Sequence, residues 1–399
     1  MRSLIFFSIV LTIIIGLSVG ARFLILYTNK KLWNWNIVDK FGRLLPFFII
    51  FIIIMAIGGG LLGIRSIMFL SAMLMATMTI AALILILSLP FSILFMKIGE
   101  KLLDFKSSPK TKIDHASRRA FLKSATAAIP MITLGTAGSG FAKAFSDVKI
   151  PQISMEFPNL PEALNGFKIL HLSDIHLGYY FTLYDLEKLL INTSEYPVDM
   201  VLVTGDVSDD LSQLPDALKL IGQIPTIYPK FVSLGNHEYY RGINDVKRII
   251  DAGPVPLLCD NGVSLKIQNA ELFIGGANDP MHMRADINEF MRDSLDKTMK
   301  DSPDKALKLL MSHRPRALDV AEQFDIDLIL GGHTHGGQIG LNGKSVFEGV
   351  MSEQYLWGKY QKGKTKLYTS SGVGHWFPYR LGCPAEAPII TLVKGSTYV

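Results

Sequence analysis

The positions of charged residues divide the 399-residue chain into a hydrophobic first part and a second part of mixed polarity. Four long stretches before residue 145 carry no charged side chain: residues 3–21, 44–64, 66–96 and 124–142. A helix that crosses a bilayer needs about 20 apolar residues, a length that the first three stretches reach. Pro90 predicts a kink or an early exit from the membrane within the third stretch. We therefore expect residues 1–110 to form an α-helical transmembrane region with three helices.

Short apolar runs alternate with amphipathic segments from residue 161 onward. Four apolar runs predict buried strands, at residues 167–172, 200–203, 231–234 and 328–330. Apolar residues at helical spacing predict helices at residues 183–191, 214–221 and 287–299. Residues 255–276 predict short strands with a turn at Asp260-Asn261-Gly262, and residues 146–160 predict a linker or a first edge strand. The alternation indicates an α/β domain over residues 146–399, long enough to bury a sizeable core.

The fourth uncharged stretch is only moderately apolar, with many Ala, Gly, Ser and Thr residues. The residues before it, 117–123, have the sequence SRRAFLK, which closely resembles the twin-arginine export signal. The alternative is a basic collar beside a membrane helix. We interpret residues 111–145 as a basic segment with this twin-arginine-like signal or a fourth helix. Ala142-Lys143-Ala144 is compatible with signal cleavage, but we favour an uncleaved anchor.

Basic residues also predict the orientation of the spans. The loop before residue 44 carries Lys30, Lys31, Lys40 and Arg43, residues 97–123 carry eight lysines and arginines, and the link between the second and third stretches has only Arg65. The positive-inside rule assigns both basic loops to the cytoplasm. The fourth stretch then leads the chain outward. We therefore expect a multi-pass protein of the cytoplasmic membrane with residues 146–399 on the extracytoplasmic side.

Composition narrows the classes of function. The chain is 49% hydrophobic and has a formal net charge of +5, with the basic residues concentrated beside the predicted spans. This distribution favours contact with anionic membrane lipid and gives no indication of nucleic-acid binding. The uncharged spans contain no acidic or histidine side chain, which disfavours a transporter with an appended domain.

Acidic, amide and histidine side chains follow the predicted strands, next to glycine or serine. The motifs are Asp174-Ile175-His176, Gly205-Asp206, Gly235-Asn236-His237-Glu238, Ser312-His313 and Gly332-His333-Thr334-His335-Gly336. Open α/β sheets place their sites at the carboxyl ends of strands. Asp174 and His176 are two residues apart, so on an extended segment both side chains point the same way. Each motif alone is compatible with an ordinary turn, but together they offer oxygen and nitrogen ligands for two metal ions.

The ordered set of motifs resembles the calcineurin-like metallophosphoesterases over about residues 150–399. Residues 171–176 and 332–338 are similar to the branch of that family attached to bacterial membranes. The resemblance implies a sandwich of two mixed β-sheets flanked by helices. By motif, it also implies that Asp174, His176 and His335 hold a first metal ion, that Asn236, His313 and His333 hold a second, and that Asp206 bridges both. His237 is then not a ligand and faces the leaving group.

The implied chemistry is hydrolysis of a phosphate or pyrophosphate ester. Two divalent ions would hold and ionise a bridging water, hydroxide would attack phosphorus, and His237 would assist the leaving oxygen. The ligands are oxygen and nitrogen atoms without a thiolate, which suits manganese, iron or zinc, and the resemblance favours manganese. Asp209 is either an acid that orients a ligand imidazole or a solvated loop residue.

The substrate is not specified, although a membrane tether favours a lipid-linked or cell-envelope phosphoester. A non-catalytic metal-binding sensor or scaffold of the same fold is the alternative, and His237 argues against it because a binding protein needs no leaving-group acid. Cys259 and Cys383 are expected to be buried thiols, with a disulfide as the alternative. His375 is a candidate substrate contact, whereas His282 and Arg284 are expected to be exposed loop residues. The sequence does not predict an oligomeric state.

Overall fold

The computed structural model describes residues 36–62, scattered positions between 64 and 136, and residues 138–395 apart from 179, 282–285 and 376. The chain divides into two compact units, Met1–Ala142 and Lys143–Val399. In the first unit, α2 (Asn36–Leu62) contains most of the uncharged stretch 44–64. No helix among the described residues is long and apolar enough to cross a membrane. The predicted span 3–21, the signal-like residues 117–123 and most of stretches 66–96 and 124–142 lie outside the described residues.

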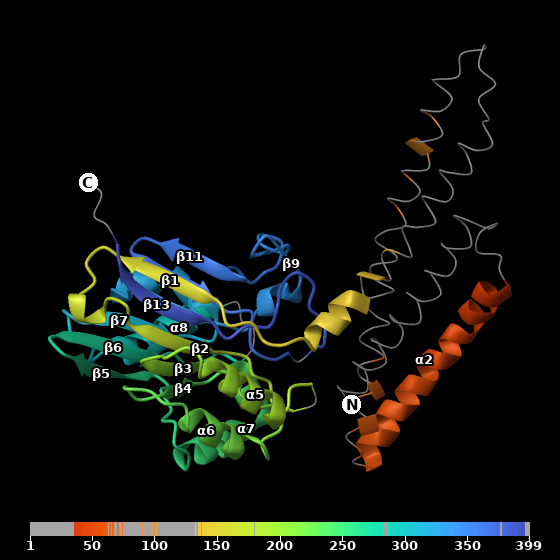
Figure 1. The fold of residues 1–399 in the computed structure, drawn as a ribbon, viewed down its shortest axis with the longest axis horizontal. Helices are drawn as coiled ribbons and strands as arrows, with labels where there is room; N and C mark the ends of the chain where they lie inside the picture. The colour runs from red at the N-terminus through yellow and green to blue at the C-terminus, as the bar shows by residue number, and fades with distance from the viewer. Residues whose placement is uncertain are drawn as a thin grey trace. The chain divides into compact units, whose positions relative to one another are not determined.

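The second unit contains two mixed β-sheets (Figure 1). The order in the five-stranded sheet is β1 (Gln152–Phe157), β13 (Ile389–Lys394), β2 (Lys168–Leu172), β3 (Met200–Thr204) and β4 (Phe231–Ser233). The order in the six-stranded sheet is β11 (Gly358–Lys362), β12 (Thr365–Thr369), β8 (Leu328–Gly331), β7 (Leu307–Met311), β6 (Ala270–Gly276) and β5 (Asn261–Ile267). Strands β2, β3 and β4 are parallel to one another, as are β6, β7, β8 and β12. Parallel neighbours bring their carboxyl ends to one edge of each sheet.

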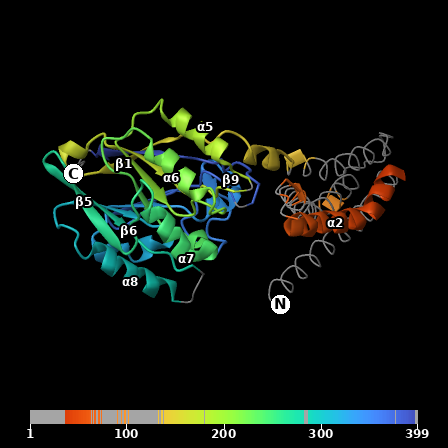
Figure 2. The ribbon, with the colours of Figure 1, turned by 90° about the horizontal axis from the view of Figure 1, so that it is seen from below.

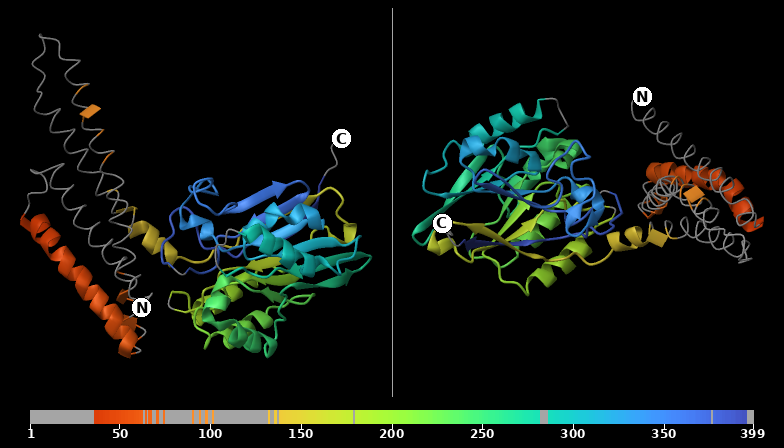
Figure 3. Two further views of the ribbon diagram at one scale, coloured as in Figure 1. Left: turned by 180° about the vertical axis from the view of Figure 1, so that it is seen from behind. Right: turned by 90° about the horizontal axis from the view of Figure 1, so that it is seen from above.

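Helices cover the outer faces of the two sheets. In Figure 2, α5 (Leu183–Thr193) and α6 (Leu214–Gly222) lie on one side of the strands and α8 (Ile287–Met299) lies on the other. The helix α7 (Asn236–Asp251) packs beside α6. The right view in Figure 3, seen from above, shows the same order of helix, strands and helix within this unit. Short 3-10 helices and a small hairpin complete the unit: η1 (Glu162–Leu164), η2 (Pro315–Asp319), η3 (Ala321–Phe324), η4 (His335–Gln338), β9 (Gly340–Leu341) and β10 (Lys344–Ser345).

The alternation of side chains along the central strands explains this layering. In β3, Met200 and Leu202 pack between the two sheets, whereas Val201 and Val203 pack against the helices α5, α6 and α7. In β8, Leu328 and Leu330 join the core between the sheets, and Ile329 faces the α8 side. Successive strand residues point to opposite faces, so a strand covered on both sides must be apolar throughout. Each fully buried aliphatic side chain contributes about 1.5–3 kcal/mol.

Most sequence predictions of individual elements are confirmed. The four predicted strands correspond to β2, β3, β4 and β8, and the three predicted helices correspond to α5, α6 and α8. Residues 146–160 contain β1, which is an edge strand. The described part of residues 146–399 is therefore an α/β sandwich of two mixed sheets, as the resemblance implied.

One element prediction was wrong and several elements were missed. Asn261 and Gly262 do not form a turn, because β5 begins at Asn261 and the hairpin turn lies around Gln268, whose φ is 53°. Gly262 serves close packing, since a Cβ there would overlap the Phe273 ring. The sequence patterns did not predict α7, which begins with Asn236, or β7, which precedes His313. They also did not predict the strands β9 to β13.

Candidate metal centre

Polar side chains from both sheets meet where the strands end. Asp174 and His176 follow β2, and Asp206 follows β3. Asn236 begins α7 after β4, His313 follows β7, and His333 and His335 follow β8. The predicted ligands fall into two close groups of His and Asp side chains, Asp174–His176–His335 and Asp206–His313–His333. This is the edge at which parallel sheets place their sites.

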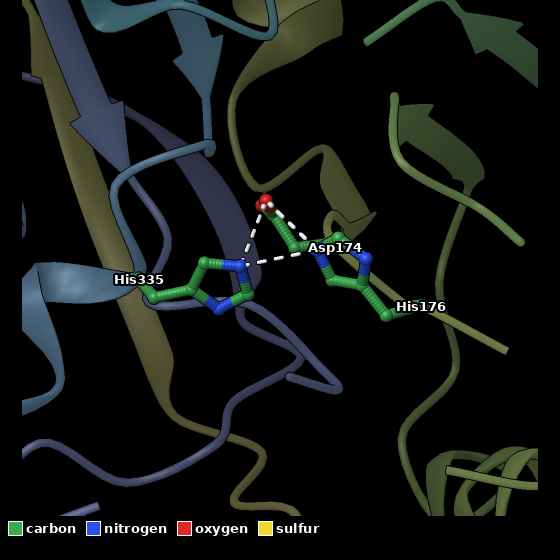
Figure 4. Close-up of side chains that lie close together, drawn as sticks. All are labelled: Asp174, His176 and His335. Atoms are coloured by element: carbon green, nitrogen blue, oxygen red, sulfur yellow. Dashed lines mark hydrogen bonds and ion pairs between the residues drawn. The ribbon is translucent and has the colours of Figure 1, made fainter. Parts of the chain in front are cut away.

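The first group is buried and its nitrogen and oxygen atoms face one another (Figure 4). Asp174 Oδ1 lies 3.4 Å from His335 Nε2 and 3.9 Å from His176 Nε2, and the two Nε2 atoms are 3.1 Å apart. Two imidazole nitrogens and a carboxylate oxygen converging in this way form a donor set suited to manganese, iron or zinc.

The second group has the same chemistry. His313 Nε2 lies 3.1 Å from Asp206 Oδ2, and the His313 and His333 rings are 5.1 Å apart between centroids. Asn236 Oδ1 and His313 Nε2 are buried and have no hydrogen-bond partner among the described residues. A buried polar atom without a partner is costly, about 1–3 kcal/mol. Both atoms are of types that bind divalent cations, so the residues present fit a metal ion.

Asp206 lies between the two groups. Its Oδ2 is 3.7 Å from His176 Nε2 of the first group and 3.1 Å from His313 Nε2 of the second. Its Oδ1 accepts a hydrogen bond of 2.8 Å from the His237 backbone N–H. Burial raises the pKa of Asp206, but the charges of His313 and His176 outweigh burial and hold this pKa well below its usual range. Asp206 is therefore an anion positioned to contact both groups.

Hydrogen bonds orient two of the imidazoles toward the centre. His313 Nδ1 lies 2.9 Å from the Thr204 carbonyl oxygen, an acceptor, so Nδ1 carries a proton and Nε2 faces Asp206. His176 Nδ1 lies 3.1 Å from Asp209 Oδ2 in the same arrangement. For His313, burial lowers the pKa, but Asp206 and Asp174 outweigh burial and raise it to about 10. This carboxylate-rich centre therefore favours cationic partners.

Asp209 also contacts His237. Its Oδ1 lies 2.6 Å from His237 Nδ1 and 3.0 Å from Arg241 Nη2. Burial raises the pKa of Asp209, but the hydrogen bonds with His176 and His237 outweigh burial and hold this pKa well below its usual range. Of the two roles left open by the sequence, the structure places Asp209 in contact with the imidazoles. His237 packs edge-on against His176, with 4.6 Å between ring centroids.

The local backbone differs from the sequence prediction. Asp174 and His176 do not lie on an extended segment, because their φ angles are 52° and 48°. Asp206, His333 and His335 also have positive φ, at 53°, 68° and 48°. The side chains of Asp174 and His176 converge because the chain coils in left-handed turns after β2, not because a strand continues. Such residues are uncommon in general and cluster at functional sites.

Several buried residues beside the centre were not singled out from the sequence. Glu238 accepts three backbone hydrogen bonds of 2.7–2.8 Å, from Gly235, Asp206 and Val207, and so connects the loops after β3 and β4. The sequence feature that could have identified Glu238 was its place in the motif of residues 235–238. Arg314 lies 2.9 Å from His333 Nε2 and is paired with Asp279 and Glu353, both at 3.1 Å. Its position next to His313 was the available signal.

The remaining sequence candidates have mixed outcomes. His375, the candidate substrate contact, is buried, while His282 and Arg284 lie outside the described residues. Cys259 and Cys383 are free thiols, the first half-buried and the second buried. Of the two thiols expected to be buried, only Cys383 is fully buried.

Comparisons with known proteins agree with this site. Residues 167–337 match the family model of the calcineurin-like phosphoesterases. An uncharacterized metallophosphoesterase of Campylobacter jejuni is 32% identical over 252 residues, which cover 62% of this chain and 64% of that protein. An uncharacterized metallophosphoesterase of Bacillus subtilis is 29% identical over 287 residues, covering 69% of this chain and 97% of the relative.

Two further comparisons concern a relative with a descriptive name and a solved structure. A zebrafish (Danio rerio) protein named as a transmembrane protein with a metallophosphoesterase domain is 28% identical over 277 residues, covering 66% of this chain and 61% of that protein. A solved dimetal phosphatase from the same organism is 11% identical, covers 52% of this chain and 88% of its own, and has a TM-score of 0.32. The family match spans the strands that carry the two groups of ligands, and over residues 167–337 the chain is similar to the calcineurin-like phosphoesterases.

Proposed function

We propose that this protein hydrolyses phosphoesters at a binuclear metal centre. Asp174, His176 and His335 would hold one ion, and Asn236, His313 and His333 would hold the other. Asp206 would bridge them. The observation that carries the proposal is the place of the Asp206 carboxylate, whose Oδ2 faces an imidazole of each group at 3.7 and 3.1 Å. Two divalent cations, when bound there, would supply Lewis acidity toward the phosphoryl oxygens and a means to ionise water near neutral pH.

The chain itself supplies a proton donor for the leaving oxygen. His237 donates Nδ1–H to Asp209 at 2.6 Å, which leaves Nε2 to act on a substrate. The Asp209 carboxylate fixes the orientation of the His237 ring, and Arg241 in turn pairs with Asp209 at 3.0 Å. A positioned imidazole of this kind contributes about 10²–10⁴-fold to turnover.

Two substitutions test the two roles separately. Asp206→Asn removes the shared anion, so we expect fewer bound metal ions by elemental analysis and no turnover. His237→Ala removes the proton donor but no proposed ligand, so we expect an unchanged metal count and a loss of about 10²–10⁴-fold in kcat. Asp216→Asn, on the exposed side of α6, is the matched control. Parent turnover in His237→Ala would refute its role, and parent stoichiometry in Asp206→Asn would refute the bridge.

The same measurements separate an enzyme from a metal-binding sensor or scaffold. A sensor would bind metal and show no metal-dependent hydrolysis of mono-, di- or pyrophosphate esters. The contact between His237 and Asp209 favours the enzyme, because metal binding alone does not need an imidazole oriented by a carboxylate outside the two ligand sets.

We also propose that the protein is anchored in the cytoplasmic membrane, with the phosphoesterase domain on the extracytoplasmic side and a lipid-linked or cell-envelope phosphoester as substrate. Support comes from the uncharged stretches, the basic residues that flank them and the name of the zebrafish relative. Protease treatment of intact spheroplasts tests the orientation, since residues beyond 150 should be cleaved. Their protection would refute it. Equal turnover of soluble aryl phosphates and of every micellar lipid-linked ester would refute the proposed substrate.

A further inference from the structure

A second concave feature lies beside the metal centre. It is a cavity of about 150 Å³ within the unit Lys143–Val399. Its walls come from residues 144–148, from α5 and the loop before it, and from the segment 373–385. A cavity of this size holds a group about as large as one benzene ring.

His375 lines this cavity and is buried, with 2% of its surface exposed. Neither of its ring nitrogens has a hydrogen-bond partner among the described residues. Phe145 packs edge-on against the His375 ring and Tyr180 stacks on it, with centroid distances of 5.6 and 5.8 Å. Burial lowers the pKa of His375 to about 3, so the ring is neutral and offers one N–H donor and one acceptor. Polar atoms left unpaired in an aromatic surround indicate a missing uncharged partner.

The charges at the cavity argue against a second phosphate as that partner. Lys188 is the only cationic side chain among its lining residues, and it pairs with Asp147 at 2.6 Å. Asp185 adds a second negative charge to the wall. The cavity therefore repels anions, and its aromatic and aliphatic walls favour an apolar body.

One wall of the cavity packs against the segment that carries two of the proposed metal ligands. Val373 N–H donates to the Ser173 carbonyl at 2.9 Å, and Gly374 N–H donates to the Asp174 carbonyl at 2.8 Å. Phe181, which also lines the cavity, lies in the short loop that follows His176. Gly374 has no room for a side chain, because a Cβ would overlap the Ile175 carbonyl oxygen. The segment that carries His375 is thus packed against the segment that carries Asp174 and His176.

We propose that this cavity binds an uncharged, ring-sized group that carries a hydrogen-bonding atom, with His375 as its polar contact. We assign this group to the alcohol part of the phosphoester, an assignment that rests on the proposed function. The cavity is then a specificity subsite beside the metal centre that selects esters of ring-bearing alcohols over esters of short open-chain alcohols.

Binding is tested on the metal-free full-length protein, independently of turnover. The probe is benzyl alcohol, titrated by saturation-transfer NMR, with butanol as the comparison. We expect a Kd for benzyl alcohol of roughly 1 mM, typical of a fragment of this size. Ala385→Met, which fills the cavity from a buried wall position, should abolish saturable binding. His375→Phe keeps the ring but removes both nitrogens, and should weaken binding about tenfold. Equal binding by the parent and both variants would overturn the site, provided that their thermal melts show folded protein.

Turnover then tests the assignment to the substrate. Benzyl phosphate and butyl phosphate release alcohols of similar acidity, so their kcat/KM ratio reports binding of the alcohol part. We expect the parent to prefer benzyl phosphate about tenfold, and Ala385→Met to lose this preference while keeping its rate on butyl phosphate. A preference that survives in Ala385→Met would overturn the assignment. Saturable binding without hydrolysis of either ester would refute the proposed function and leave the cavity as a binding site.

Discussion

Asp209→Asn tests whether a residue that orients a metal ligand, without being a proposed ligand itself, controls metal affinity. The two carboxylate oxygens of Asp209 accept from two imidazoles at once, Oδ2 from His176 Nδ1 at 3.1 Å and Oδ1 from His237 Nδ1 at 2.6 Å. An asparagine has the same shape but only one acceptor oxygen. Its amide group would face an N–H of one imidazole, donor against donor, and that imidazole would have to move its proton to Nε2. A His176 protonated at Nε2 has no lone pair for a metal at that atom.

The size of the effect follows from this loss of orientation. Removal of a group that hydrogen-bonds a metal-binding histidine weakens metal affinity about 10–100-fold, which corresponds to about 1.4–2.8 kcal/mol. Only the group of Asp174, His176 and His335 should be affected, because His313 is oriented by the Thr204 carbonyl instead. We therefore expect one of two sites to weaken by this factor and the other to keep its affinity.

Metal titration against a buffered free-manganese series, with the bound metal measured by elemental analysis, checks this expectation. Asp210→Asn is the matched control, since Asp210 is the neighbouring acid and accepts hydrogen bonds from Ser212 and Gln213. Thermal melts of the metal-free proteins show whether either variant is misfolded. Two sites of parent affinity in a folded Asp209→Asn protein would refute the reasoning, as would an equal loss at both sites.

Three other outcomes can be measured. Gly332→Ala should lower stability by about 1–3 kcal/mol and weaken the first metal site, because its Cβ would overlap Ser173 Oγ and Asp174 Oδ2. The control Gly138→Ala, at a position with open space, should do neither. Parent stability and metal binding in Gly332→Ala would contradict this close packing. Burial lowers the pKa of His171 to about 3, so metal-free stability should fall as pH decreases from about 6.5 toward 3, by up to about 1.36 kcal/mol per pH unit from this one group. The non-titrating His171→Phe should flatten that slope in denaturant titrations, and an unchanged slope would contradict a neutral buried His171. Burial raises the thiol pKa of Cys259 to about 11 and of Cys383 to about 12. At pH 8 a thiol reagent should therefore react slowly with the folded protein and rapidly with two thiols after unfolding. The absence of a reactive thiol after unfolding would indicate a disulfide.

Local pattern was sufficient to predict the elements that form the layers of the fold. Strands β3 and β8 are buried on both faces, so their apolar runs are continuous and easily found. The helix α5 was predicted from its apolar spacing, and Thr182 with Asp185 forms a capping box at its start. By contrast, β7 contains Lys308, whose ammonium pairs with Asp325 at 3.3 Å, and this charge interrupts its apolar run. The helix α7 was missed because its first turn contains Asn236, His237 and Glu238, which were interpreted as part of a metal-binding motif rather than as the start of a helix.

The site could be predicted as a set of residues but not as a geometry. Motif order alone brought out Asp174, Asp206 and His333, because resemblance transfers chemical identity along the chain. It could not indicate that Arg314 lies beside His333, since that contact also needs Asp279 and Glu353 from distant segments. It also could not reveal the cavity around His375, which depends on residues 144–148 packing near α5.

The left-handed backbone at the ligands bears on whether the site exists before any metal binds. Asp174, His176, Asp206, His333 and His335 all have positive φ, a conformation that costs about 1–2 kcal/mol for a residue with a Cβ. Backbone hydrogen bonds offset that cost, since Asp174 N–H donates to Gly205 and His176 N–H donates to Asp206, at 3.1 and 3.0 Å. The His333 N–H donates to the Asp174 carboxylate at 3.0 Å, which joins the loops of the two sheets. Because these bonds involve only protein atoms, the fold positions the ligands by itself, and metal affinity is not spent on folding the loops.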